Sequence, residues 1–407
     1  SSRLKIYFVA NAHINTQQAF SAILSHKFNK KFPKLANESI LTHNISKQYT
    51  FTFAFLPTFL YICIKHQVVL MKPLVSVIIV TYNQESTIAR AIDSVLGQAC
   101  NFKFEIILGE DCSMDKTREI CIDYAKRFPD IIKLHLNSHN KGVLKNYFDC
   151  FAACSGKYIA DCAGDDFWID SNKLQQQVDI LEKDNSLSAV HTKWFFYHAE
   201  SHKKELSDTR GDFSAFRKPR ISGKELLLPI LTQKKIPVIH TCTTLFRADI
   251  LRKAYEKDPY LFRNSDFICE DLQLTFILAL NGNIAFIDTP TLCYTVEDNS
   301  ISNTTDDLKQ FKFSLGVLKL CQYISSHYNI TDPELDKFLD EVLFKMLMHL
   351  FRSKSFDLTN LVDNEAKLLG GYNIKCKILS IILKHKILYY PTKLFRDSIV
   401  YIKNKLH

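Results

Sequence analysis

The sequence predicts an α/β fold, in which helices cover both faces of a mostly parallel sheet, followed by a helical C-terminal region. Between residues 75 and 181, runs of β-branched residues alternate with segments whose apolar residues recur at helical spacing. Strands and helices that alternate in this way are joined by right-handed crossovers and form parallel sheets. From residue 308 onward the pattern is helical. The 407 residues are 46% hydrophobic and 23% charged, as expected for a globular chain with a substantial core.

The first unit begins with the run V-S-V-I-I-V at 75–80. A nearly continuous run of β-branched residues is typical of a strand that is buried on both faces. The loop 81–85 follows, and the apolar residues of 88–96 then recur at i, i+3, i+4, i+7 and i+8. This spacing places them on one face of a helix.

Three more units repeat the order of strand, loop and helix or turn. Their predicted strands cover 104–108, 131–136 and 158–162. The acidic loop 109–115 follows the first of these strands, N-K-G at 140–142 follows the second, and Gly164-Asp165-Asp166 follows the third. Ligands of parallel sheets bind beyond the carboxyl ends of the strands. We therefore expect the loops 81–85, 110–115 and 165–166 to share one edge of the sheet and to form a site there.

The second half of the chain is less regular. A helix is predicted around 174–181 and a strand around 188–197, and the polar stretch 200–220 is interpreted as an exposed loop. A strand over 237–246 and a helix over 262–280, which carries Glu270 and Asp271, come next. The remaining predictions are strands at 284–287 and 291–296 and helices at 311–328 and 334–351.

The first part of the chain lacks this alternation, and Met71 is the first methionine in the sequence. We expect Met71 to be the natural start. The predicted organisation is an extension over 1–70, a main domain over 71–305 and a helical, basic region over 306–407.

The net charge of +9 is concentrated at the two ends. Residues 1–72 hold nine basic residues and one acidic, and residues 375–407 hold eight basic and one acidic. Because the part between them is net acidic, the distribution argues against nucleic acid as a partner. Basic ends are typical of solvated tails or of contact with an anionic membrane face. Near the C-terminus, aromatic residues among lysines suit an interfacial helix as well as an ordinary packed pair of helices; they are Tyr389, Tyr390, Phe395 and Tyr401.

The twelve cysteines are scattered and form no C-x-x-C pair and no zinc-type spacing with histidine. This pattern predicts core thiols in a reducing compartment, which indicates the cytoplasm. The basic tail would allow peripheral contact with the inner membrane face.

An ordered set of motifs resembles family 2 glycosyltransferases, which have the GT-A fold with a Rossmann-like sheet. The motifs are V-S-V-I-I-V-T-Y-N at 75–83, E-I-I-L-G-E-D-C-S-M-D at 105–115, N-K-G at 140–142, G-K-Y-I-A at 156–160, G-D-D-F-W at 164–168 and E-D at 270–271. The resemblance covers roughly residues 73–300. It implies a nucleotide-sugar donor, a divalent metal, inversion at the anomeric carbon and a saccharide or lipid-linked acceptor in surface polysaccharide synthesis.

The resemblance also implies roles for the donor side of the site. The positions that match the nucleotide pocket are Thr81, Tyr82, Asn83 and Glu85. Glu110 and Asp111 match the acidic pair that holds the base and ribose, a task that suits carboxylates because they accept hydrogen bonds from N–H and hydroxyl groups. A solvated turn is the alternative for this pair.

The remaining implied roles concern the metal and the proton. Asp165 matches the ligand of Mg²⁺ or Mn²⁺, which neutralises the departing diphosphate, and Asp166 matches the residue that orients the donor sugar. Asp271, with Glu270 beside it, matches the general base that takes the proton of the acceptor hydroxyl. The alternative for Glu270 and Asp271 is an acidic helix start that the helix dipole favours.

Two positions depart from the family pattern. Ala163 stands where a first acidic residue often lies, and Thr295 lies in a stretch where many relatives place Arg and His. Asp161, two residues before Ala163 on the predicted strand, has its side chain on the same face and is a substitute candidate. These departures motivate a second hypothesis, a catalytically decayed protein that binds a sugar or nucleotide. A nucleotidyltransferase is a third hypothesis, but the loop 81–85 has no glycine of the kind a phosphate loop requires.

Overall fold

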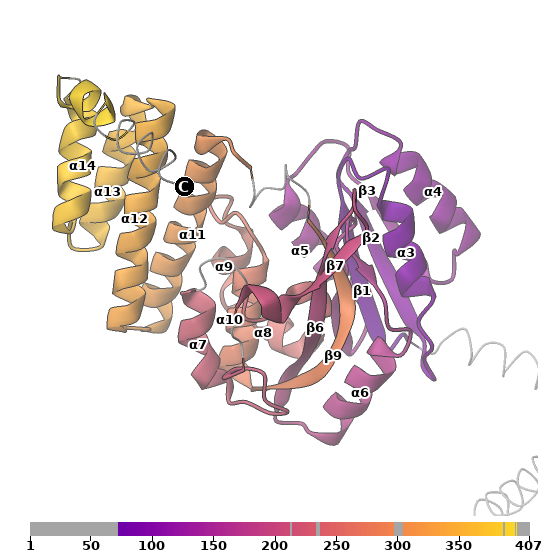
Figure 1. The fold of residues 1–407 in the computed structure, drawn as a ribbon. Coiled ribbons are helices and arrows are strands. Elements are labelled where there is room, and N and C mark those ends of the chain that lie inside the picture. Colours follow the sequence, from indigo (N-terminus) through magenta and orange to yellow (C-terminus); the bar gives the residue numbers. More distant parts are fainter. Residues whose placement is uncertain are drawn as a thin grey trace, which may run out of the picture. The chain divides into compact units, whose positions relative to one another are not determined.

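The computed structural model describes residues 72–211, 214–232, 237–296, 304–385, 387–394 and 396. The predicted extension 1–70 lies outside the described residues. Nine strands form one sheet with the order β3-β2-β1-β4-β8-β6-β9-β5, and β7 pairs with β6 (Figure 1). Most of the paired register is parallel, as predicted.

The first half of the sheet is wholly parallel. Its strands are β1 (Val75–Thr81), β2 (Phe104–Glu110), β3 (Ile132–Leu136) and β4 (Tyr158–Asp161). β1 lies between β2 and β4, so that Thr81 is in register with Glu110. The carboxyl ends of β1 and β2 therefore lie side by side, as the strand and helix alternation predicted.

The second half of the sheet is mixed. It contains β5 (Phe167–Trp168), β6 (Leu187–His198), β7 (Lys203–Leu206), β8 (Leu245–Arg247) and β9 (Asn283–Val296). β8 runs antiparallel to both β4 and β6, whereas β6 and β9 are parallel along almost their whole length.

Two strand predictions need correction. The expected strand over 237–246 is only β8, because a 3₁₀ turn over Thr241–Thr243 precedes it. The two expected strands at 284–287 and 291–296 are one strand, β9. The pairing of β9 with β6 shifts register around residues 287–292, so the two predicted strands stay in one sheet and Pro290 lies within it.

The expected exposed loop 200–220 contains β7 and a 3₁₀ turn over Ser207–Arg210.

Helices cover both faces of the sheet, as predicted. One face packs α3 (Ile88–Leu96), α4 (Thr117–Arg127) and α6 (Lys173–Lys183). The other packs α5 (Val143–Ala153), α7 (Gly223–Leu231), α8 (Ala248–Lys257), α9 (Pro259–Arg263) and α10 (Asp271–Asn281). Successive side chains of β1 point to opposite faces of the sheet. Ile79 packs in the core beneath α3, α4 and α6, and Ile78 packs in the core on the other face.

The predicted helix over 262–280 is two helices. α9 ends at Arg263 and α10 begins at Asp271, with Glu270 as its N-cap residue. Glu270 and Asp271 therefore lie at the start of a helix and not within one. All residues of α10 from Leu272 to Ala279 are buried.

The C-terminal region is helical, as predicted, with α11 (Asp307–Tyr328), α12 (Pro333–Ser353), α13 (Thr359–Leu368), α14 (Ile374–Lys384) and a further helical stretch over 387–394. A 3₁₀ turn over Phe356–Leu358 precedes α13. The apolar residues of these helices belong to the same hydrophobic core as α7 and α10. In the described part of the chain, no helix combines the length and apolar character that crossing a bilayer requires.

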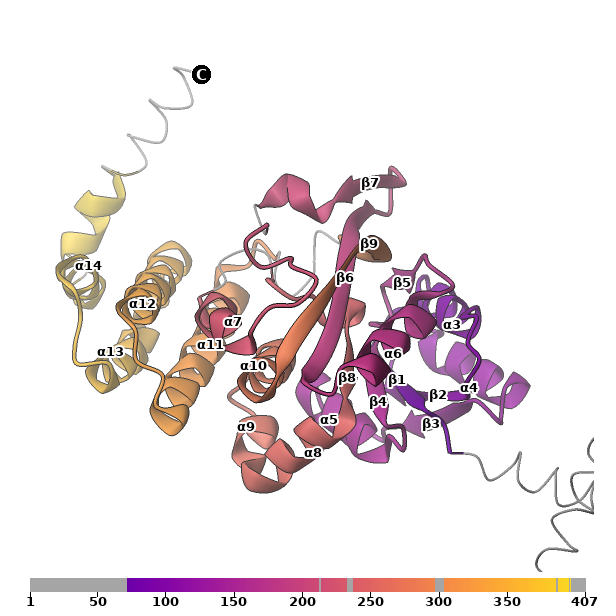
Figure 2. The ribbon, with the colours of Figure 1, turned by 90° about the horizontal axis from the view of Figure 1, so that it is seen from below.

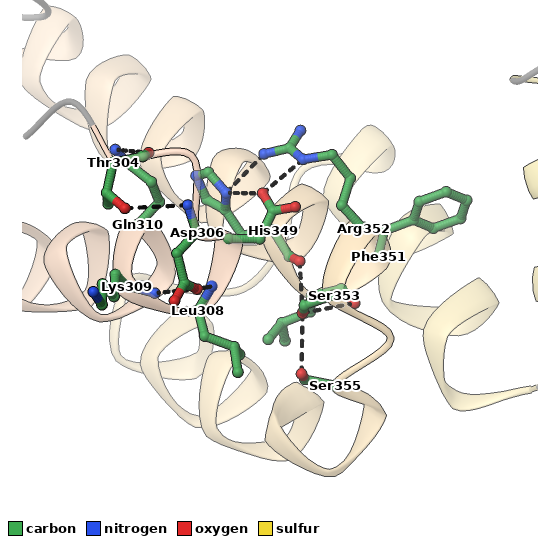
Figure 3. Close-up of polar contacts among 12 residues, drawn as sticks. Thr304, Asp306, Leu308, Lys309, Gln310, His349, Phe351, Arg352, Ser353 and Ser355 are labelled. Atoms are coloured by element: carbon green, nitrogen blue, oxygen red, sulfur yellow. Dashed lines mark hydrogen bonds and ion pairs between the residues drawn. The ribbon is translucent and has the colours of Figure 1, made fainter. Parts of the chain in front are cut away.

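Polar contacts fix the start of α11 on α12. The Asp306 carboxylate accepts hydrogen bonds from the backbone of Leu308 and Lys309, which caps the helix (Figure 3). The next residue, Asp307, accepts a 2.8 Å hydrogen bond from His349 and a 2.7 Å bond from Arg352 of α12. Although burial opposes the effect, these two donors lower the pKa of Asp307.

Candidate functional site

The loops that follow β1 and β2 are joined by reciprocal hydrogen bonds. Backbone N–H groups of one loop meet side chains of the other in five places: Asn83 N to Ser113 Oγ, Gln84 N to Thr117 Oγ1, Glu85 N to Asp115 Oδ2, Met114 N to Asn83 Oδ1 and Lys116 N to Glu85 Oε2, all between 2.7 and 3.1 Å. The expected convergence of these loops on one edge of the sheet is confirmed.

The four residues of the predicted nucleotide pocket differ in what they offer a ligand. Thr81 is buried and donates from Oγ1 to Gln84 Oε1 at 2.8 Å. Asn83 has a φ of 52°, in the left-handed region that Asn tolerates better than most residues, and its side chain is engaged with the Met114 N–H. Glu85 holds Lys116 N. Tyr82 is 40% exposed, so its ring has a face available for stacking.

Glu110 ends β2 and is fully buried. Its Oε1 accepts a 2.6 Å hydrogen bond from Ser113 N, and its Oε2 accepts a 2.6 Å bond from Arg118 Nε. Arg118 also donates to the backbone carbonyl of Asn137. Glu110 therefore shapes the acidic loop and neutralises a cation at the base of the site.

Asp111 connects the acidic loop to the N-K-G loop. Its Oδ1 accepts from Asn137 Nδ2 and Lys141 N, and its Oδ2 accepts from Gly142 N, each at 2.9 Å. A carboxylate has about four acceptor positions, so three intramolecular donors leave capacity for one more. Gly142 has a φ of 82°, a conformation that glycine adopts without strain.

The loop 163–166 packs tightly against the end of β1. A Cβ added to Gly164 would collide with Gln84 Oε1 and would lie 2.9 Å from the Thr81 side chain. The Asp166 carboxylate is buried and accepts a 2.9 Å bond from Thr295 N, and the Thr295 hydroxyl donates to the Asp165 carbonyl at 2.5 Å. Thr295, which departs from the family pattern, thus holds the acidic loop in place.

Burial and the neighbouring charge of Asp165 raise the pKa of Asp166 well above its ordinary value. Asp165 itself is only half-buried. The two carboxylates are therefore placed differently, since Asp166 is enclosed by protein whereas Asp165 is accessible to a ligand.

Arg90 of α3 is a site residue that the sequence did not indicate. Its Nη2 donates to the carbonyl of Asp165 and to Thr295 Oγ1, both at 3.3 Å. Its guanidinium lies 4.1 Å from the centre of the Phe167 ring and 5.1 Å from that of Tyr197. Arg90 supplies a positive charge beside the acidic loop, which lowers the pKa of Asp166 against the effect of burial.

Glu270 and Asp271 are placed beside the 3₁₀ turn that precedes β8. Thr241 Oγ1 donates a 2.6 Å hydrogen bond to Asp271 Oδ1. Burial, together with the charge of Asp271, raises the pKa of Glu270 to about 8. Burial also raises the pKa of Asp271, although the Thr241 bond opposes it.

A third carboxylate, Asp161, belongs to the same electrostatic group. From the sequence it was only a substitute candidate for the acidic residue that is missing at Ala163. It is 5% exposed, and Tyr147 of α5 donates a 2.8 Å bond to its Oδ1. Burial raises the pKa of Asp161 to about 7, and the charge of Asp271 adds to the effect. The buried Lys173 lowers the pKa of Asp161, while burial lowers the pKa of Lys173 itself to about 7.

The acidic loop with Asp165 and Asp166 offers carboxylate ligands of the kind that a divalent metal prefers. Among the described residues, no three His, Cys, Asp or Glu side chains form a ready-made cage. Mg²⁺ is commonly held by one or two carboxylates together with substrate phosphates, a pattern that needs no such cage. The accessible Asp165 next to Asp166 fits this pattern, with the remaining ligands supplied by the substrate and water.

Fold and site together define an α/β protein with an acidic ligand site at the carboxyl ends of a largely parallel sheet. Residues 76–254 match the family model of glycosyl transferase family 2. This segment of the chain is therefore similar to the family. The matched segment includes the donor-side loops and ends before Glu270 and Asp271.

Two relatives extend this finding. The uncharacterized glycosyltransferase RT0329 of Rickettsia typhi is 28% identical over 311 residues, which are 74% of this chain and 88% of the relative. The Escherichia coli protein WfgD, described as a UDP-Glc:alpha-D-GlcNAc-diphosphoundecaprenol beta-1,3-glucosyltransferase, is 36% identical over 112 residues, 28% of this chain and 42% of the relative. The chain spans less than half of the length of the relatives that it matches at 36–39% identity.

A solved structure is similar in fold. S. aureus TarS 1–349 in complex with UDP-GlcNAc superposes with a TM-score of 0.53 at 16% sequence identity, covering 81% of this chain and 92% of that one. Together with the family match, this likeness confirms the expected GT-A fold.

Proposed function

We propose that this chain is an inverting glycosyltransferase, of the hexosyltransferase type, that moves a sugar from a nucleotide-sugar donor to a saccharide or lipid-linked acceptor. The observation that carries the proposal is the arrangement around one sheet edge. The loops after β1 and β2 are hydrogen-bonded together there, and the loop with Asp165 and Asp166 is held by Thr295 of β9. The half-buried Glu270 and Asp271 complete the acidic group. Carboxylates with strongly perturbed pKa values cluster at catalytic sites, which favours an enzyme over a protein that only binds a ligand.

The nucleoside is proposed to bind on the loops after β1 and β2. Tyr82 offers an exposed ring for the base, and Asp111 has acceptor capacity for a base N–H or a ribose hydroxyl. Thr81, Asn83, Glu85 and Glu110 act mainly through the hydrogen bonds that shape the two loops.

The diphosphate is proposed to lie near Asp165 and Asp166. Asp165 would hold Mg²⁺ or Mn²⁺, which when bound neutralises the charge that develops on the leaving diphosphate. Asp166 is enclosed and held by Thr295, so we assign it to orienting the donor sugar. Arg90 fixes the loop that carries both carboxylates.

The transfer step needs a base on the acceptor side. Asp271, held by Thr241, takes the proton of the acceptor hydroxyl while the oxygen attacks the anomeric carbon. The new C–O bond forms as the bond from the anomeric carbon to the phosphate oxygen breaks, and the nucleoside diphosphate leaves with the electron pair. Burial and the charge of Asp271 keep Glu270 protonated beside this carboxylate. A base whose pKa lies near the working pH is the most effective.

The acceptor and location are assigned by analogy. The printed name of WfgD describes transfer of glucose to a sugar on diphosphoundecaprenol, so we propose a lipid-linked acceptor in surface polysaccharide synthesis. A lipid-linked acceptor would place the chain in the cytoplasm with peripheral contact at the inner membrane face. Within the chain, residues 71–305 are proposed as the glycosyltransferase domain and 306–407 as a helical region.

A thermal-shift panel tests the donor class first. The purified chain is measured with UDP-, GDP-, dTDP- and CMP-sugars, each with Mn²⁺ and with a chelator. A ligand that binds only the folded state raises the melting temperature. We expect a metal-dependent shift for one nucleotide, the loss of its metal dependence in Asp165→Asn, and mass-spectrometric detection of sugar transfer to a diphosphate-linked acceptor. A folded protein that responds to no nucleotide would favour the decayed binding protein that Ala163 and Thr295 suggested.

A further inference from the structure

The outermost helix of the C-terminal region exposes apolar side chains on the face that points away from its neighbours. Figures 1 and 2 show α14 at the edge of the helical group, beside α13 and α12. Ile374, Ile378 and Ile381 of this helix are 71%, 53% and 44% exposed. Of the fifteen large apolar side chains that are exposed in the described residues, eight lie between Leu368 and Leu394. The exposure is therefore concentrated in one part of the chain.

The exposed isoleucines form a stripe opposite the packed face of α14. Cys376, Leu379, Ser380 and Leu383 face the core of the helical region. At about 100° per residue, Ile374, Ile378 and Ile381 lie within about 60° of one another and roughly 180° from that packed face. We call these three residues the isoleucine stripe. A helix that only packed against its neighbours would place polar residues at these positions.

Lysines flank the isoleucine stripe on both sides. By the same helical spacing, Lys375 lies on one flank and Lys377 and Lys384 on the other. Lys375 and Lys377 are exposed, whereas Lys384 is paired with Asp363 of α13. Over residues 374–396 the sequence has six basic residues and no acidic residue. The surface therefore combines an apolar centre with a positively charged border.

The following helical stretch, 387–394, has the same organisation. Tyr389 is fully buried, donates its hydroxyl to the Phe351 carbonyl at 3.0 Å and meets the Phe356 ring edge to face. Ile387 and Leu394, on the opposite side of the turn, are 86% and 72% exposed. The sequence had grouped Tyr389 with residues that suit an interface. In the structure, Tyr389 packs into the core and thereby leaves Ile387 and Leu394 facing solvent.

We propose that α14 and residues 387–394 form a docking surface for an anionic lipid bilayer. An interfacial helix buries its apolar face about 5–10 Å into the headgroup region, and basic residues at its border are attracted to anionic lipids. The isoleucine stripe supplies the apolar face, and Lys375 and Lys377 supply the basic border. A second copy of this chain fits the charge less well, because the same positive border would face itself across a twofold axis.

The inference deepens the proposed function, since it assigns a membrane surface to the enzyme that we place at a lipid-linked acceptor. It is tested without donor or acceptor, so that its failure is distinct from a failure of transfer. The full chain is floated with vesicles of phosphatidylcholine alone and with vesicles that also contain phosphatidylglycerol. We expect binding to the anionic vesicles, weakened at about 1 M salt, where charges are screened beyond about 3 Å.

Two variants separate the apolar and the charged contributions. The triple change Ile374→Ser, Ile378→Ser and Ile381→Ser should reduce partitioning roughly tenfold or more, because apolar burial drives interfacial binding. The double change Lys375→Gln and Lys377→Gln should reduce it about fivefold per lysine on anionic vesicles. The matched control, Lys126→Gln with Lys145→Gln, removes the same charge from exposed positions of α4 and α5 and should leave binding unchanged.

Three results would overturn the proposal. Equal binding to neutral and anionic vesicles would show that the lysines do not contribute to lipid binding. Undiminished binding of both variants would place the contact elsewhere in the chain. Analytical ultracentrifugation gives the third. If the wild type is a dimer, the isoleucine variant is a monomer and no vesicles bind, the surface is an interface between copies. Circular dichroism of each variant confirms that the helices remain folded.

Discussion

The Thr241 hydroxyl donates a 2.6 Å hydrogen bond to Oδ1 of Asp271, from a 3₁₀ turn to the first residue of α10. The bond fixes the orientation of a carboxylate that is otherwise surrounded by buried groups, and it opposes the effect of burial on the pKa of Asp271. A single hydroxyl therefore both positions the proposed base and keeps it more readily ionised. The first two predictions follow from this contact.

Replacing Asp271 by Asn should abolish transfer while sparing the donor. Asn keeps the shape of the side chain and can still accept from Thr241, but it cannot take a proton from the acceptor. General bases contribute about 10²–10⁴-fold, so kcat should fall by that factor. Donor affinity, measured by calorimetry, should change little. Glu270→Gln is the comparison, and a larger loss of kcat in that variant would transfer the role of base to Glu270.

The pH dependence of transfer should respond in opposite directions to two conservative changes. Thr241→Val removes a bond that lowers the pKa of Asp271, so the acidic limb of kcat/KM should move to higher pH. Tyr147→Phe removes a bond that lowers the pKa of Asp161. Asp161 then stays neutral to higher pH and repels Glu270 and Asp271 less, so the limb should move to lower pH. The groups that face this cluster are Tyr147 and Lys173, and limbs that move together in both variants would contradict the assignment.

Stability should fall as pH rises through the range in which Glu270 is titrated. Glu270 has an ordinary pKa of 4.5 and a pKa of about 8 in the folded chain. Between these values the folded state holds a proton that the unfolded state has released, so the free energy of unfolding decreases with pH. Glu270→Gln carries no such proton. Its melting temperature should exceed that of the wild type above pH of about 8, by a few degrees.

The control for this measurement is Glu256→Gln, an exposed glutamate on α8. It should follow the wild-type melting temperature at every pH. A Glu270→Gln curve parallel to that of the wild type would show that Glu270 is not held protonated by its surroundings.

Gly164→Ala should damage the donor site. The added methyl would meet Gln84 Oε1 and the Thr81 side chain, which forces the end of β1 and the acidic loop apart. Overpacking of this kind costs about 1–3 kcal/mol, so we expect a melting temperature lower by a few degrees and roughly tenfold weaker donor binding. Gly97→Ala is the matched control, because a Cβ at the end of α3 would lie 3.3 Å from the Asp93 carbonyl and needs only a small adjustment. Unchanged donor affinity in Gly164→Ala would separate this loop from the donor.

The parts of the fold that depend on local pattern were predictable from sequence. Strands β1 and β2 are predicted by their runs of apolar and β-branched residues. The loops 81–85 and 110–115 were expected to meet because the carboxyl ends of parallel strands lie at one edge of the sheet. The position of Arg90 was not predictable. It is one of several polar residues on α3, and its contact with Thr295 joins positions 205 residues apart. No local pattern encodes a contact of that separation.

The faces of α14 show the same limit. Its sequence has two apolar faces, so the spacing of Ile374, Ile378 and Ile381 predicts a packed face as well as that of Cys376, Leu379 and Leu383 does. Only the tertiary structure determines which set meets the neighbouring helices. Asp161 was a candidate from the sequence only as a substitute for the acidic residue missing at Ala163. Its hydrogen bond from Tyr147 and its electrostatic coupling to Asp271 required the tertiary structure.

The bond from the Thr295 hydroxyl to the carbonyl of Asp165 spans 130 residues of chain. During synthesis, the acidic loop therefore leaves the ribosome long before the strand that fastens it. A nascent chain that ends at residue 254, where the family match stops, already contains both aspartates but lacks Asp271 and Thr295. Its loop would keep the bond from Arg90 but would lack the contacts with Thr295, and its proposed base would be absent. The complete acidic group therefore requires β9, the last described strand in the chain.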